Sequence, residues 1–223
     1  MNIFSKFFYN TDDNINANTI NAFKGNLTSL VQKYPNLQDN IMGIGSIFMD
    51  QGKNPSTMNS FNLPNYVKSA FMQNGTVGAY TPNTHQMIFE IPKDNPNKAF
   101  KYFAHELAHS IDYADVNRNG TVADDVGLNQ YGSFSASKEF VNALSADLKG
   151  LEGKNIAATY PNLANELRYP LQGANSSYLT HHNVRESFAL LASHIMTGED
   201  KTSGIAQALP NTYALAQQKI AAA

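Results

Sequence analysis

The sequence contains no cysteine among its 223 residues. This absence excludes disulfides, thiolate ligands to zinc and cysteine nucleophiles together. It does not fix the cellular compartment, because a chain without thiols is compatible with oxidising and with reducing surroundings. Long apolar runs are missing as well: no stretch approaches the roughly 18 apolar residues of a membrane-spanning helix. Residues 1–18 also lack the apolar segment of a signal peptide.

An excess of charge of one sign is also missing. The formal net charge is −2 and lysine and arginine form no cluster, so we do not expect a nucleic-acid-binding protein. Hydrophobic residues make up 42% and charged residues 15% of the chain, which is typical of neither disordered nor membrane proteins. Length and composition predict one globular domain over residues 1–223, and we expect it to be a monomer.

The spacing of apolar residues predicts both helices and strands. In the first half we predict a helix over 19–34, a buried strand over 41–50, and two strands over 77–80 and 86–91. The last two form either a hairpin or two sequential strands. Helices are predicted over 94–115, 137–151, 162–168, 183–198 and 211–223. The domain thus has a helical N-terminal region (1–40), a sheet followed by a long helix (41–113) and a helical part (114–223).

Residues 105–109 read HELAH and lie within the predicted helix over 94–115, which Asp94 or Asn95 can cap. At about 100° per residue, this helix presents two opposite faces. One face is apolar and contains Phe100, Phe103, Leu107 and Ile111. The other contains Tyr102, His105, His109 and Asp112. The helix therefore separates a core-facing side from a side that can carry chemistry.

The pattern HExxH is typical of a catalytic zinc site. Two histidines at i and i+4, here His105 and His109, can present ring nitrogens to one zinc ion. Glu106 would not be a ligand; as general base it would take a proton from the zinc-activated water and pass it to the leaving amine. The alternative is that these are ordinary polar residues on a helix surface.

A catalytic zinc site needs a third protein ligand. The continuation HExxHxxGxxH fails, because Asp112 and Asp115 stand where glycine and histidine are required. We predict Glu186, which lies away from the apolar stripe of the helix over 183–198. The alternatives are Asp112, His181, His182 and His194. Of these, Asp112 would rather orient a ligating imidazole from outside the ligand set, and His85 is predicted to be a surface residue.

Three blocks of the sequence together resemble the catalytic domain of anthrax lethal factor and its relatives, the bacterial Pro-Pro endopeptidases. They are HELAHSIDY, RESFALLASHIM and LPNTYALAQQKI. The matching residues are His105, Glu106, His109, Ile111, Asp112, Glu186, Phe188, Ala189, Pro210, Thr212 and Tyr213. The resemblance covers most of residues 77–113 and 178–220.

The resemblance implies a zincin-like α+β fold, with a small mixed sheet whose edge strand lies over the active-site helix, a second ligand helix and a helical C-terminus. It also implies a secreted, toxin-like zinc metalloendopeptidase, and an extended peptide substrate along residues 77–90. The alternative for residues 77–90 is an ordinary core strand. Tyr178 corresponds to the family's catalytic tyrosine, which would donate a hydrogen bond to the oxyanion, although it stands eight residues before Glu186 rather than seven.

Residues 115–120, DVNRNG, match the opening of a calcium loop, with possible ligands at Asp115, Asn117 and Asn119. The twelfth position should be acidic but is Val126, so an Asn-Gly turn is favoured over a calcium site. The sequence therefore predicts a zinc metalloendopeptidase. The alternative is a non-catalytic binding module, or a toxin-like subunit, that retains a structural zinc site.

Overall fold

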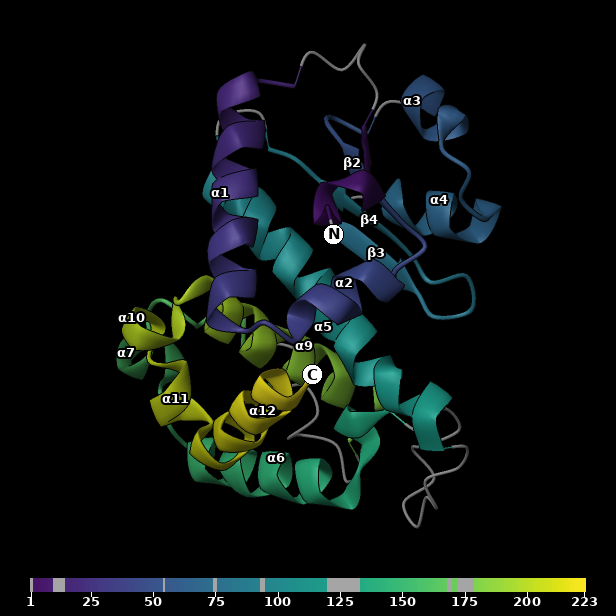
Figure 1. The fold of residues 1–223 in the computed structure, drawn as a ribbon. Coiled ribbons are helices and arrows are strands. Elements are labelled where there is room, and N and C mark those ends of the chain that lie inside the picture. Colours follow the sequence, from purple (N-terminus) through teal and green to yellow (C-terminus); the bar gives the residue numbers. More distant parts are fainter. Residues whose placement is uncertain are drawn as a thin grey trace. The chain divides into compact units, whose positions relative to one another are not determined.

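The computed structural model describes residues 2–9, 15–53, 55–73, 76–92, 95–119, 133–167, 170–171 and 179–223. It is a mixed α/β structure with a small sheet and a mostly helical remainder (Figure 1). The chain forms two compact units, Met1–Ser110 and Ile111–Ala223. Helix α5 (Pro96–Asn119) continues across the division, so it belongs to both units. No helix of the described residues is apolar over a length that would cross a membrane.

The first unit contains a four-stranded mixed sheet with the strand order β1-β2-β4-β3. β1 (Phe7–Tyr9) pairs in parallel with β2 (Ser46–Asp50), and β2 pairs in parallel with β4 (Gln86–Glu90). β3 (Gly78–Thr81) is antiparallel to β4 and ends the sheet. The predicted hairpin of residues 77–91 is thereby confirmed, and its first strand lies at an edge.

A cluster of phenylalanines fills the core on one face of this sheet. Phe23 of α1 (Ala17–Lys33) lies at its centre and is 1% exposed. Its ring centroid is 5.5 Å from that of Phe89 in β4, 5.6 Å from that of Phe7 in β1 and 5.4 Å from that of Phe103 in α5. The two helices are therefore held against the sheet by edge and stacked contacts between aromatic rings.

The opposite face of the sheet is covered by α3 (Pro55–Ser60) and α4 (Asn65–Phe71), which lie beside the strands in Figure 1. The buried side chains here are Phe48, Met58, Phe61, Leu63, Val67, Phe71 and Ile88, and Ala79 of β3 packs against them. Because successive side chains of a strand point to opposite faces, Ile88 and Phe89 belong to different clusters. The central strands β2 and β4 are thus buried on both sides.

The predicted strand over 41–50 is only half correct. Residues Leu37–Gly43 form the short helix α2, and the strand β2 begins at Ser46. Leu37, Ile41 and Ile44 are buried and recur at helical spacing, which fits a helix with one apolar side. The 3-10 helix η1 (Ile3–Lys6) and strand β1 were not predicted at all.

The second unit is helical over its described residues. Its elements are η3 (Phe134–Ala136), α6 (Lys138–Leu151), α7 (Ile156–Thr159), α9 (His181–Thr197), α10 (Asp200–Ser203), α11 (Ile205–Ala208) and α12 (Pro210–Ala222). The helices predicted over 137–151, 183–198 and 211–223 are confirmed, whereas 161–167 forms turns rather than a helix. The rings of Phe134, Phe140 and Phe188 meet edge to face, with centroids 5.4 to 5.8 Å apart.

Asp147 of α6 joins this helix to the start of α12, and the two helices are neighbours in Figure 1. One carboxylate oxygen accepts hydrogen bonds from the backbone N–H of Asn211 (3.2 Å) and from its side-chain amide (2.7 Å). The other accepts from the backbone N–H of Thr212 (2.8 Å) and from its hydroxyl (2.6 Å). Asp147 therefore caps a helix that begins more than 60 residues further along the chain.

Candidate metal centre

Helix α5 positions the two histidines of HELAH. The helix begins as predicted, because Asn95 accepts a hydrogen bond from the Lys98 backbone N–H at 3.0 Å. Its apolar face is buried, with Phe100 5% exposed and Phe103, Leu107 and Ile111 fully covered. The predicted core-facing side is thus confirmed. Its burial sets the rotation of α5 about its axis, and therefore the side to which the histidines point.

His105 and His109 lie one turn apart on α5. Their ring centroids are 4.9 Å apart and their planes are nearly perpendicular, at 86°. His109 is 6% exposed and Glu106 is 4% exposed, while His105 is half-buried. Side chains of this polarity are seldom buried without a partner or a bound ion, so their burial separates them from ordinary surface residues.

Strand β3 lies alongside α5 at this point. A Cβ atom at Gly78 would stand 2.6 Å from Cγ and 2.7 Å from Cδ of Glu106. Two residues further on, the side chain of Tyr80 is hydrogen-bonded to that of Ser110. Burial raises the pKa of Tyr80, an effect that this hydrogen bond partly offsets. The edge strand of the sheet therefore contacts the helix that carries Glu106.

Helix α9 positions Glu186. Thr180 caps the helix in a capping box with Asn183, and Gly198 ends it in the left-handed conformation with φ 77°. The glutamate side chain is 19% exposed, and its Oε1 lies 3.8 Å from Nδ1 of the exposed His182. The apolar residues around it on the helix, among them Val184 and Phe188, are fully buried as predicted.

His105, His109 and Glu186 make up the one group of three potential metal ligands among the residues that the structure describes. Each offers one ligand atom, a ring nitrogen from either histidine and a carboxylate oxygen from Glu186. Two imidazoles and one carboxylate are a donor set that suits zinc and leaves a coordination position for water. The three residues are those that the sequence predicts as ligands.

The carboxylate of Asp112, predicted to orient a ligating imidazole, is hydrogen-bonded to Ser135. Its two carboxylate oxygens accept hydrogen bonds from the backbone N–H and the hydroxyl of Ser135, both at 2.7 Å. The aspartate is fully buried, and this burial raises its pKa to about 6, although Ser135 and the positive charge of Arg185 oppose the shift. The carboxylate therefore ties α5 to the segment that precedes α6. Its predicted role in orienting a ligating imidazole stays a prediction.

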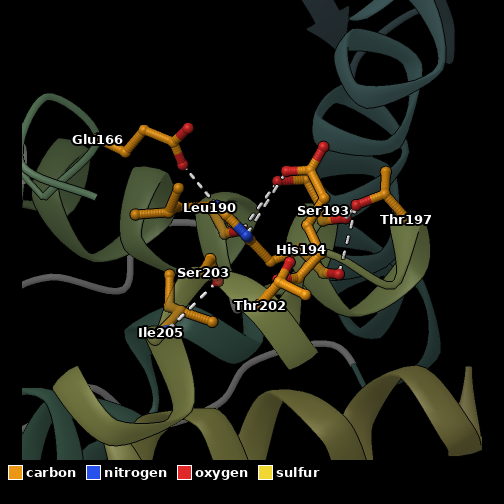
Figure 2. Close-up of polar contacts among 9 residues, drawn as sticks. Glu166, Leu190, Ser193, His194, Thr197, Thr202, Ser203 and Ile205 are labelled. Carbon is orange, nitrogen blue, oxygen red and sulfur yellow. Dashed lines mark hydrogen bonds and ion pairs between the residues drawn. The ribbon is translucent and has the colours of Figure 1, made fainter. Parts of the chain in front are cut away.

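His194, one of the alternative third ligands, lies between two carboxylates (Figure 2). Its Nε2 is 2.5 Å from Oε2 of Glu166, and its Nδ1 is 3.7 Å from Oε2 of Glu199. The histidine side chain is 2% exposed. Because its two ring nitrogens face different carboxylates, the residue links α9 to segments on either side of it. The structure thus gives His194 a role in holding the second unit together.

Several predicted residues lie outside the described part of the chain. Tyr178 is among them, and so are residues 120–126 of the possible calcium loop. The backbone of residues 115–119, which would open that loop, continues helix α5 instead. His85 is exposed as predicted, in the turn of the β3–β4 hairpin, where its Nδ1 is 3.1 Å from the Tyr80 hydroxyl.

Comparisons with family models, with curated proteins and with solved structures give no match to this chain. The resemblance to the lethal factor catalytic domain therefore stays a prediction.

Proposed function

We propose that the protein is a zinc-dependent metalloendopeptidase in which His105, His109 and Glu186 bind zinc. The observation that carries this proposal is the histidine pair one turn apart on α5, with ring centroids 4.9 Å apart, next to a buried Glu106. A histidine pair with a glutamate beside the first histidine, and a carboxylate from another helix, is one of the arrangements found in zinc peptidases.

In this proposal each residue has a distinct task. Zinc, when bound, would polarise the peptide carbonyl and lower the pKa of a water molecule. Glu106 would accept the proton of the attacking water and deliver it to the amine of the leaving product. Its low exposure, 4%, sets Glu106 apart from the solvated glutamates of an ordinary protein surface.

The proposed substrate is a peptide that pairs with the sheet as an extended strand. β3 ends the sheet, pairs with β4 on one side, and lies against the helix that carries Glu106. Added-strand pairing at such an edge would fix the peptide backbone across the general base. By resemblance, we propose further that the protein is secreted, that its fold is zincin-like, and that Tyr178 donates a hydrogen bond to the oxyanion.

The proposal is tested by metal removal in a peptide library. We expect the purified protein to cleave a defined set of peptides, to lose this activity after chelation of zinc, and to regain it when zinc is restored. The library should include peptides with proline on both sides of the scissile bond. If the protein binds zinc but cleaves no peptide, the proposal is wrong, and a binding module with a structural zinc site becomes the better explanation.

The assignment of Glu186 is tested separately by zinc affinity. Loss of a residue that only hydrogen-bonds to a metal ligand typically weakens metal binding by roughly 10- to 100-fold. Glu186→Ala should weaken zinc binding by more than this, because it removes a ligand itself. Glu152→Ala is the control, since Glu152 is an exposed carboxylate at the end of α6 and is not among the proposed ligands. Competition with a chelating dye measures both constants. Equal affinities in wild type and Glu186→Ala would refute this assignment.

A further inference from the structure

Strand β3 and helix α5 run side by side in a fixed register. The contacts are Gly78 with Glu106 and Tyr80 with Ser110. Gly78 and Tyr80 are two residues apart on the strand, which spans about 6.6 Å. Glu106 and Ser110 are four residues apart on the helix, which spans about 6 Å, so the two contacts are spaced equally on both elements. Side chains alternate along a strand, which explains why the intervening Ala79 packs on the opposite face of the sheet. The register is therefore maintained along the strand.

Strand β3 can lie this close to Glu106 of α5 only because residue 78 is a glycine and has no side chain. A Cβ atom there would collide with Cγ and Cδ of Glu106, at 2.6 and 2.7 Å, and not merely with the end of a flexible side chain. Glu106 is 4% exposed, so its side chain is surrounded by other groups of the protein rather than extended into solvent. Any residue larger than glycine would therefore displace the carboxylate or push the strand away from the helix.

The backbone of Gly78 points toward the open edge of the sheet. The Glu90 N–H donates to the Val77 carbonyl at 2.8 Å, which marks Val77 and Glu90 as a hydrogen-bonded pair of the antiparallel ladder. Residues of such a ladder alternate, so the N–H and C=O of Gly78, the next residue, are directed away from β4. They are the groups with which an added strand would pair closest to Glu106.

We propose that Gly78 is a positioning residue that sets the place of Glu106 relative to a peptide bound at the β3 edge. Gly78 thus acts on both the general base, Glu106, and the bound peptide. Its missing side chain makes room for the general base, and its backbone groups receive the substrate strand. This inference rests on the proposed peptidase function, but the contact between Gly78 and Glu106 does not.

The catalytic part is tested with Gly78→Ala in the zinc-loaded protein. We expect kcat to fall about 100-fold, which is the cost of misplacing a catalytic group by about 1 Å, while KM and zinc content change little. Gly25→Ala is the matched control, because nothing lies within 4 Å of a Cβ atom at that exposed position of α1. It should retain full activity. A Gly78→Ala variant with kcat within about threefold of wild type would overturn the inference.

A conservative change in Glu106 distinguishes positioning from general damage. Aspartate is one methylene shorter, so it removes Cδ and Oε1 of Glu106 from the space that the new Cβ of Gly78→Ala would occupy and leaves only the Cγ contact. Gly78→Ala should therefore reduce kcat less in a Glu106→Asp background than in wild type, because substitutions of contacting residues are not additive. Equal reductions in both backgrounds would mean that Gly78 does not act through Glu106.

The contact itself is tested by thermal unfolding, which needs neither zinc nor activity. Gly78→Ala should lower the unfolding midpoint by roughly 2–10 °C through overpacking. In a Glu106→Ala background the same change should cost much less. If this coupling is present but the wild type cleaves no peptide, the peptidase proposal fails and the packing contact stands. If the coupling is absent while peptides are cleaved, the positioning role is refuted.

Discussion

Glu106→Gln should reduce peptide hydrolysis by about 10³-fold or more while the protein still binds one zinc ion. Glutamine has nearly the shape of glutamate, so it fills the same buried space against Gly78. Its amide cannot accept the proton of the attacking water, and general acid–base catalysis typically contributes 10²- to 10⁴-fold. Zinc content by mass spectrometry and kcat/KM on the best library peptide measure the two expectations.

This substitution distinguishes a general base from a structural carboxylate. Glu152→Ala is a suitable control, because Glu152 is an exposed residue at the end of α6 and should leave both zinc content and kcat/KM unchanged. Loss of zinc from Glu106→Gln would indicate that the residue helps to hold the ligands instead. A variant with more than a tenth of wild-type kcat/KM would contradict the assigned role.

Asp147→Ala should destabilise the protein by about 3–5 kcal/mol. Asp147 is 4% exposed, and its carboxylate accepts four hydrogen bonds from Asn211 and Thr212 in the first turn of α12, two of them from backbone N–H groups. Hydrogen bonds to a charged group contribute about 1.5–3 kcal/mol each, although such values do not add fully. The fully buried Thr212 hydroxyl would also lose its acceptor. Urea unfolding followed by circular dichroism measures the change in free energy.

The matched variant is Asp147→Asn, which keeps one acceptor oxygen of the two. It should lose part of the stability, and the loss should be smaller than that of Asp147→Ala. Peptidase activity per folded molecule is expected to remain, because Asp147 is not among the residues proposed to bind zinc or substrate. An Asp147→Ala variant within about 0.5 kcal/mol of wild type, as is usual for surface changes, would contradict the capping role.

The parts of the fold that could be predicted have signals within a short stretch of sequence. Helix α9 has a capping residue, an apolar stripe and a final glycine, and it was predicted almost to its bounds. The HELAH helix was predicted from its cap and its apolar face in the same way, and the hairpin from two apolar segments around TPNTH. Glu186 could be chosen only because a zinc site needs one more ligand than HELAH supplies.

The parts that could not be predicted depend on residues far apart in the chain. Asp147 has no local sign that it caps α12, since Asn211 and Thr212 are more than 60 residues away. Gly78 looks like any glycine in a strand until Glu106 is placed beside it. Ser135, the partner of Asp112, likewise has no motif of its own. Side-chain pairs of this kind become visible only when the helices and strands are packed.

The order of pairing in the sheet has a consequence for how the first unit folds. The parallel pairs join residues about 40 positions apart, Phe7 with Ile47 and Ser46 with Gln86, so each requires closure of a long loop. The β3–β4 hairpin joins neighbouring strands, and hairpins form in about 1–10 μs. The hairpin and the helix that follows it are therefore formed by local contacts. Pairing of β1 and β2 with them requires contacts between distant residues and is expected to be slower. Gly78, Glu106 and the histidine pair lie in the segment that can assemble first.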